Sequence, residues 1–273
     1  MRTCITFTLL FLCIVVNAQS KKDVPDNEII EQLRNKSMKI ETDRAVLWFK
    51  DSATDKGKAQ QFANDITTGI IAIETFTGKS FEKEYYNAAK IEYFISDLTT
   101  VSHVYNGYHH NEGERLPFIF FSSKRFAQNS IPYLHETTHL ILHEFHSLWL
   151  REGMAEWVAM KVAQQLGKGH TAFYGDDHAK DPHQLAAGIH THEGKDVVMN
   201  LVGKNGIPAF KNTEIRRMFY IGSTSLVMYL AEQLTKEDLL ALYFEKDTEQ
   251  WLAQKLQQPV SDIKTAWLKH LPS

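Results

Sequence analysis

The chain has 273 residues, a formal net charge of −3 and a pI near 6.5. This near-neutral balance lacks the basic excess typical of nucleic-acid-binding proteins, so we expect no nucleic-acid partner. Beyond the first twenty residues the sequence has no apolar run of transmembrane length, and the chain length fits one large domain or two closely joined lobes.

The first eighteen residues predict a secretory signal peptide. Met1-Arg2-Thr3 is a short positive start, and the apolar run from Ile5 to Val16 is too short to span a membrane. Small residues precede a cleavage site after Ala18. Both cysteines, Cys4 and Cys13, lie in this segment, so the mature chain has no disulfide and must bind metals through His and carboxylates. We therefore expect a secreted or periplasmic protein.

The N-terminal half predicts a small mixed sheet. Residues 19–43 are charged and poor in large apolar side chains, so we expect a loose arm there with a short helix near Ile29 to Leu33. Apolar, β-rich segments predict strands at 45–49, 90–95 and 116–121, and helical spacing of apolar residues predicts a covering helix over 58–76.

Residues 135–139 form the HExxH pentapeptide His-Glu-Thr-Thr-His, within a helix predicted over residues 131–144 with Ser130 as its cap and Pro132 in its first turn. Histidines four residues apart lie on one helix face, so both imidazoles can bind one ion. Glu136 would then face the open side of the metal, where a carboxylate can take a proton from water. The alternative is a surface helix that carries these histidines without a metal.

Residues 149–156, Trp-Leu-Arg-Glu-Gly-Met-Ala-Glu, open a second predicted helix, which runs from Leu150 to Leu166. Glu152 falls in the apolar stripe of this helix, and a buried carboxylate needs a compensating charge such as a bound dication. Glu156 follows one turn later, where it can accept a hydrogen bond from the far ring nitrogen of a ligating histidine. The alternative is that both glutamates are solvated.

The segment from residue 167 to 208 is rich in Gly, His and Asp and shows no sustained period. Its ionisable side chains could form a second metal site or line the active-site cleft, but we favour a solvated loop; the side chains concerned are Asp176, Asp177, His178, Asp181, His183, His190 and His192. His143 and His146 are expected to interact with the negative end of the HExxH helix rather than with a metal. Helices are predicted at 216–234, after the capping box 235–238, at 251–257 and at 261–271.

HExxH followed by a helix with the pattern W-L-x-E-G-x-A-E resembles the gluzincin metallopeptidases, in particular the small bacterial peptidase MA-like proteins. More distant similarity extends to clostridial collagenases, aminopeptidase N and thermolysin. The resemblance implies an α+β, zincin-like domain over residues 44–273, with an N-lobe of about 44–146 and a mostly helical C-lobe of about 147–273. It implies Glu152 as the third zinc ligand, and Tyr220 as the counterpart of a tyrosine that stabilises the oxyanion, although Ser223 stands where the family has glycine.

Two absent patterns narrow the expected family and activity. A metzincin would carry Gly and His where this chain has Leu142 and Phe145. The chain also lacks the Gly-x-Met-Glu-Asn segment with which aminopeptidase N holds a free amine, so amino-terminal trimming is not expected and endopeptidase action is the default by elimination.

The sequence thus predicts a zinc metallopeptidase that binds one Zn²⁺ through His135, His139 and Glu152. Glu136 is the expected general base and Tyr220 the expected oxyanion donor. The expected partner is a peptide or protein substrate, with no stable membrane insertion after signal cleavage. Two other classes stay open: a catalytically inactive zinc-binding protein, against which the intact Glu136 argues, and an exported binding module with an accidental motif.

Overall fold

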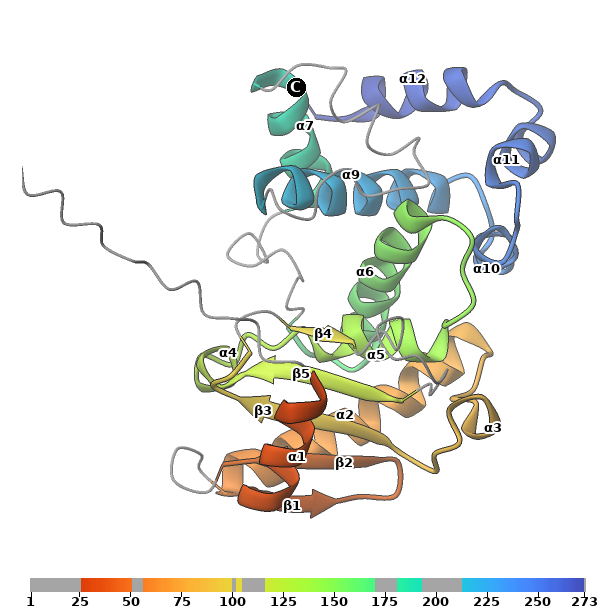
Figure 1. The fold of residues 1–273 in the computed structure, drawn as a ribbon. Helices are drawn as coiled ribbons and strands as arrows, with labels where there is room; N and C mark the ends of the chain where they lie inside the picture. Colours follow the sequence, from red (N-terminus) through yellow and green to blue (C-terminus); the bar gives the residue numbers. More distant parts are fainter. Residues whose placement is uncertain are drawn as a thin grey trace, which may run out of the picture.

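The structure, a computed structural model, is an α+β protein with a small mixed sheet followed by a mostly helical C-terminal part, which confirms the predicted fold class (Figure 1). It describes residues 26–50, 56–99, 102–104, 116–169, 181–192 and 213–272. The predicted signal peptide, with its cleavage site at Ala18, lies outside these ranges, as do Asp176, Asp177 and His178. None of the helices within the ranges is long and apolar enough to cross a membrane.

The sheet, as far as these residues describe it, has the strand order β1-β2-β3-β5-β4. β2, β3 and β5 are parallel, whereas β1 and β4 run antiparallel to their neighbours at the two edges. Leu47, Tyr93 and Ile119 stand side by side across the three central strands. The strands are β1 (Met38–Glu41), β2 (Ala45–Phe49), β3 (Ile91–Ser96), β4 (His103–Val104) and β5 (Phe118–Ser122). The three strands predicted from the sequence are confirmed with small shifts at their ends.

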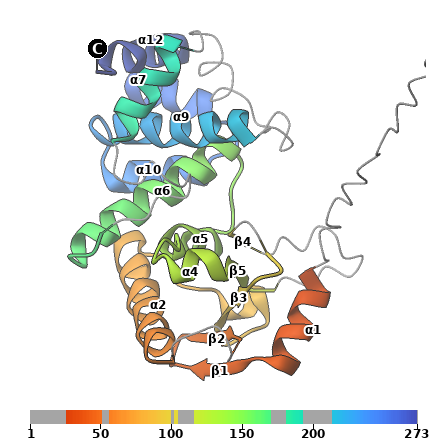
Figure 2. The same ribbon diagram turned by 90° about the vertical axis from the view of Figure 1, so that its left-hand side faces the viewer.

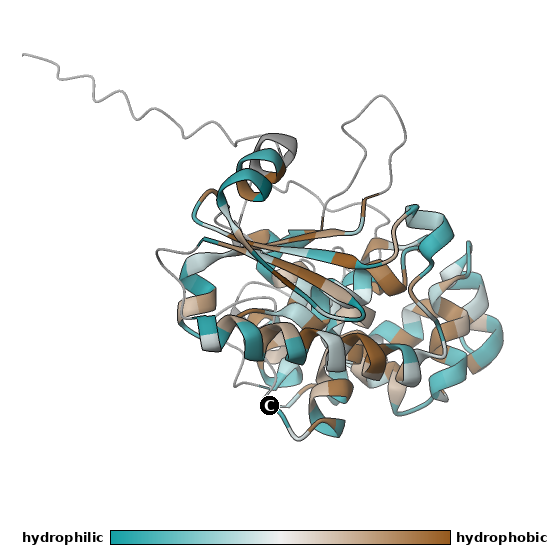
Figure 3. Cartoon of the chain, turned by 90° about the horizontal axis from the view of Figure 1, so that it is seen from below, coloured by the Kyte–Doolittle hydropathy of each residue, from teal (hydrophilic) through white to brown (hydrophobic). Residues whose placement is uncertain are grey.

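Helices α1 (Asp26–Lys36) and α2 (Lys56–Thr77) lie on opposite faces of this sheet (Figure 2). α2, whose predicted range was 58–76, contributes Ile66 and Ile70 to the main hydrophobic core. Because the sheet is covered on both faces, its central strands do not alternate between buried and exposed side chains. All five residues of β5 are accordingly buried. Figure 3 accordingly shows brown, hydrophobic stretches in the central strands and both brown and teal sides on the surrounding helices.

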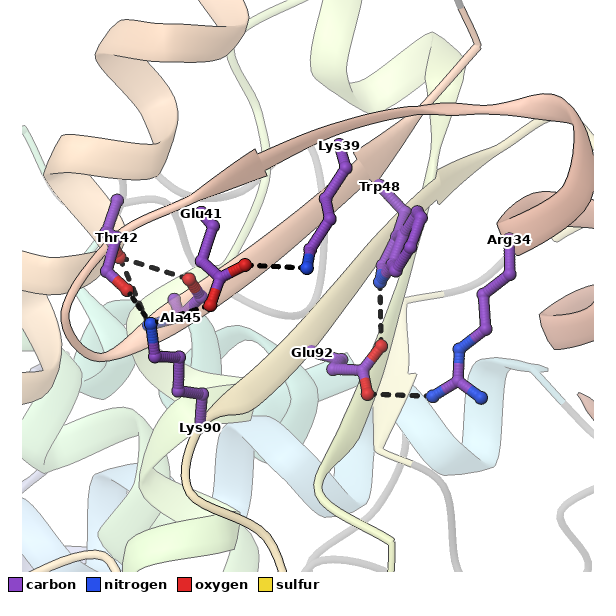
Figure 4. A network of polar contacts seen from close by, with 8 residues as sticks. All are labelled: Arg34, Lys39, Glu41, Thr42, Ala45, Trp48, Lys90 and Glu92. Carbon is purple, nitrogen blue, oxygen red and sulfur yellow. Dashed lines mark hydrogen bonds and ion pairs between the residues drawn. The ribbon is translucent and has the colours of Figure 1, made fainter.

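The expectation that residues 19–43 form a loose arm is wrong for residues 26–41, which form α1 and β1. α1 buries Ile30 and Leu33 against phenylalanines of the sheet, and β1 pairs with β2. Polar contacts add to this packing (Figure 4): the Glu92 carboxylate accepts hydrogen bonds of 2.7 Å from both Arg34 of α1 and the indole N–H of Trp48. The short helix expected near Ile29 to Leu33 is thus confirmed, but it is longer than expected and is packed against the sheet.

The remaining helices build the C-terminal part and connect it to the sheet. They are α3 (Lys83–Tyr86), α4 (Ser123–Ala127), α5 (Tyr133–Ile141), α6 (Leu148–Gln165), α7 (Pro182–His192), α9 (Thr213–Ala231), α10 (Lys236–Tyr243), α11 (Thr248–Leu256) and α12 (Val260–His270). The predicted capping box is confirmed, because the Thr235 hydroxyl accepts a 3.1 Å hydrogen bond from the Asp238 backbone N–H. α7 was not predicted, and it buries Ala186 and Ile189 in the main core.

Candidate metal centre

Helix α5, which carries the HExxH motif, is shorter than the predicted range of 131–144. Pro132 occupies the N-cap position, and Ser130 is not the cap, since its hydroxyl donates to the Arg125 carbonyl. At the other end Leu142, with φ −102° and ψ 57°, leaves the helical conformation. The chain therefore turns before His143, which does not lie on the helix.

Tyrosine hydroxyls from distant elements hold α5 in place. Tyr86 of α3 donates to the Leu140 carbonyl at 3.0 Å, and Tyr243 of α10 donates to the Leu142 carbonyl at 2.7 Å. The last carbonyls of a helix lack partners within it, so these bonds satisfy groups that would otherwise be buried and unpaired. The Tyr93 hydroxyl of β3 contacts the helix from the sheet side. The orientation of α5 is thereby tied to both parts of the fold.

Helix α6 supplies the second half of the centre and is buried over most of its surface, including every residue from 152 to 159. It crosses α9 closely at Gly153. A Cβ at that position would lie 2.5 Å from the Ser223 carbonyl oxygen and 2.7 Å from the Val227 side chain. Because the shorter of these approaches is to backbone, α9 itself would have to move. Gly153 thus permits the approach that brings Tyr220 of α9 towards the motif.

Three potential ligand atoms from α5 and α6 converge. His135 Nε2 and His139 Nε2 are 3.1 Å apart, and Glu152 Oε2 lies 3.5 Å from the first and 3.3 Å from the second. Ligands bound about 2.0–2.1 Å from a tetrahedral ion stand roughly 3.3–3.4 Å from one another. All three side chains are buried. Two imidazoles and a carboxylate at these spacings fit a divalent metal ion.

The electrostatics of this trio favour a cation between its members. Burial opposes a charge on His135, but hydrogen bonds with Glu152 and Glu156 outweigh it and raise the pKa of His135 to about 10. Burial lowers the pKa of His139 to about 4, which leaves that imidazole neutral, the form that ligates metals. Without a metal the site thus holds a proton on His135, and an arriving cation would displace it.

Glu136 lies beside the trio with an unsatisfied carboxylate oxygen. The side chain is 2% exposed, and its Oε1 has no hydrogen-bond partner among the described residues. Burial, together with the charge of Glu152, raises the pKa of Glu136 to about 7. A buried oxygen without a partner fits a place where a water molecule or substrate group is normally present.

Glu156 and Tyr220 also reach this region. Glu156 Oε2 is 2.8 Å from His135 Nδ1, so the Nδ1–H donates to the carboxylate, and Nε2 is the ring nitrogen on the side of the converging ligands. Burial raises the pKa of Tyr220 well above its ordinary value, and the charges of Glu152 and Glu136 raise it further. The phenol therefore keeps its proton and can act as a hydrogen-bond donor. The structure brings together all six residues singled out from the sequence.

Arg151 is a residue of the centre that the sequence did not reveal. Its Nη1 is 3.5 Å from Glu152 Oε1, and its guanidinium lies 4.9 Å over the Phe145 ring. Burial acts to raise the pKa of Glu152, but the nearby His139 and Arg151 outweigh burial and hold that pKa well below its usual range. Adjacent helical residues point in different directions, so spacing alone does not bring Arg151 to Glu152; its long side chain reaches back.

His103 of β4 is a second such residue. It stacks on Phe120 with ring centroids 5.1 Å apart. It also lies within electrostatic range of Glu136, and a positive charge on His103 would lower the pKa of Glu136. A strand of two residues leaves no periodic signal, so nothing in the sequence pointed to it.

The other histidines that the sequence analysis singled out, where the structure describes them, fall outside the centre. His143, expected at the helix end, instead stacks on Tyr85 at 3.7 Å with its Nε2 3.1 Å from Glu82 Oε2. His146 is exposed in the turn that follows. In the segment 167–208, His183 and His190 lie on α7, whereas the side chain of His192 is outside the described residues.

Comparison with protein-family models found no match, and a search of curated proteins found none either. The fold and the site therefore define the class of protein at a coarse level: an α+β protein with a buried His-His-Glu group at metal-binding distances.

Proposed function

We propose that this chain is a secreted, zinc-dependent peptidase of the gluzincin type. The observation that carries the proposal is the convergence of two imidazole nitrogens and one carboxylate oxygen beside the unpaired Oε1 of Glu136. A ligand set of two imidazoles and one carboxylate, without cysteine, suits zinc among the common divalent ions. The apolar segment that ends before the predicted cleavage site supports export.

Zinc held by His135, His139 and Glu152 would supply a Lewis acid that polarises a peptide carbonyl and lowers the pKa of a water molecule towards about 7. Glu136 then takes the proton of the attacking water at Oε1 and passes it to the nitrogen of the leaving amine. A pKa of about 7 suits a group that both accepts and returns a proton near neutrality. Glu156 keeps His135 in the tautomer that this arrangement needs.

An extended peptide is the substrate that the surroundings of the centre favour. β4 is the edge strand of the described sheet on the side of α5 and packs against that helix. An edge strand offers backbone N–H and C=O groups to an added extended segment. His103 of the same strand lies within electrostatic range of Glu136, so a peptide paired with β4 would run past the general base. Together with the missing amine-binding segment, this favours cleavage within a chain.

The proposal is tested by measuring zinc in the purified mature protein and its cleavage of a mixed peptide library, before and after chelation. We expect stoichiometric zinc, cleavage at internal bonds, loss of cleavage with chelator and recovery with added Zn²⁺. Zinc-loaded protein that leaves every peptide intact would favour a catalytically inactive zinc-binding protein. Protein without stoichiometric zinc would favour an exported binding module.

Tyr220→Phe tests the proposed oxyanion donor, because it deletes one hydroxyl and nothing else. Loss of such a donor typically costs about 10²–10³ in kcat. We expect a fall of that size with unchanged zinc content, measured by steady-state kinetics and elemental analysis. Tyr229→Phe, on the same helix, is the control and should keep wild-type kcat. An unchanged kcat in Tyr220→Phe would mean that another group donates the hydrogen bond to the oxyanion.

A further inference from the structure

A second group of metal-ligating side chains lies in the C-terminal part, away from α5. His183 of α7, Glu232 directly after α9 and His270 at the end of α12 offer ligand atoms that all lie within 4.8 Å of one another. Figures 1 and 2 both show α7 and α12 on the same side of α9. The three residues are far apart in sequence, so the packing of three helices creates the group.

His183 is the buried member and is held by a defined hydrogen bond. It is 9% exposed, and its Nδ1 is 2.9 Å from the Ser225 hydroxyl oxygen, which also accepts a 2.9 Å hydrogen bond from the Trp267 indole N–H. A hydroxyl oxygen can accept twice, so His183 can donate its Nδ1–H there. Metal-binding histidines characteristically donate their other ring N–H in this way.

The other ring nitrogen of His183 is left without a hydrogen-bond partner from the described residues. Nε2 is buried and has no hydrogen-bond partner among the described residues. Burial lowers the pKa of His183, so the imidazole is neutral and presents a lone pair at Nε2. A buried ring nitrogen without a partner is unusual in a native protein and calls for a water molecule or an ion.

The two other members face this nitrogen from the solvent side. His270 Nε2 is 3.4 Å from Glu232 Oε1, and the rings of His270 and His183 are 5.3 Å apart at 74°. Both side chains are partly exposed and can adjust their rotamers to shorten the spacing. An adjoining cavity of about 380 Å³ gives a cation access from solvent, and its described lining includes the acidic Asp181 and Glu232 along with Lys161.

We propose that His183, Glu232 and His270 form a second site, which binds a divalent transition-metal ion such as zinc. Two imidazoles and one carboxylate are the donors that such ions prefer over Ca²⁺ or Mg²⁺. The ion ties α7 and the last turn of α12 to the C-terminal end of α9. Because it binds the folded arrangement and not the unfolded chain, its effect is to stabilise the helical part. This site is independent of the proposed peptidase centre.

The test counts zinc in a background where the first centre is disabled. In the Glu152→Gln mature protein we expect one remaining equivalent of Zn²⁺ by equilibrium dialysis and elemental analysis, and a melting temperature that rises on adding Zn²⁺. Adding His270→Ala should remove both effects, and adding Glu232→Gln should weaken zinc binding more than about 100-fold, beyond the loss typical for a residue that only supports a ligand.

Lys269→Gln is the matched control, since Lys269 is the exposed neighbour of His270 on the same helix turn. It should keep the second equivalent and the zinc-dependent rise in melting temperature. His270 lies at an exposed helix end, so its replacement is compatible with folding, which circular dichroism verifies. The proposal is overturned if the Glu152→Gln protein binds no zinc, or if zinc binding persists unchanged in both the His270→Ala and Glu232→Gln combinations.

Discussion

The Glu136→Gln variant should retain zinc and its fold but lose about 10²–10⁴-fold in kcat, the contribution typical of a positioned general acid–base group. Glutamine keeps the shape of the side chain but cannot take a proton from water. The change leaves His135, His139 and Glu152 intact. It also removes a buried carboxylate whose charged form burial disfavours, as the raised pKa of Glu136 indicates. We therefore expect no loss of stability.

The measurement combines steady-state peptide hydrolysis with elemental analysis of the same preparation. Glu144→Gln is the matched control, because Glu144 is an exposed glutamate shortly after the same helix. It should show wild-type kinetics. Activity of Glu136→Gln within tenfold of wild type would refute the assigned base. Loss of zinc in that variant would show instead that Glu136 supports the metal.

Glu152→Gln should largely abolish zinc binding at the candidate centre, whereas Glu156→Gln should weaken it by about 10–100-fold, as loss of a residue that orients a ligand does. The two glutamates sit one turn apart on α6 but contact the histidines differently. Glu152 Oε2 lies 3.5 and 3.3 Å from the two Nε2 atoms, on the side where the ligands converge. Glu156 Oε2 instead lies 2.8 Å from Nδ1 of His135, on the far side of the ring.

Competition of each variant against a zinc chelator measures both affinities. The comparison is made in the His270→Ala background, so that zinc held near His183 is not counted. Each glutamate serves as the control for the other, because both changes remove one buried carboxylate charge from the same helix. If Glu156→Gln loses zinc and Glu152→Gln binds it normally, the ligand assignment is wrong by one helical turn.

Much of the scaffold around the site could be predicted from local patterns. The apolar run of β2 and the helical spacing of α2 were recognisable because both bury a regular set of side chains. β1 and β4 were missed, and α1 was expected only as a short helix in a loose arm, because these elements are short or mostly polar and their positions depend on partners elsewhere in the chain. The end of α5 at Ile141 was missed for the same reason, since Tyr86 and Tyr243 satisfy its last carbonyls from outside.

The sequence by itself determined the proximity of His135 and His139, because a helical period of about 3.6 residues puts positions four apart on one face. It also marked Glu152 as a carboxylate in an apolar stripe. Only the tertiary structure decided what surrounds them. The approach of Tyr220 depends on the crossing of α6 and α9 that Gly153 permits, and the grouping of His183 with Glu232 and His270 depends on the packing of three helices. Periodicity is a short-range property of one segment, whereas these contacts arise from side-chain volumes that meet across the fold.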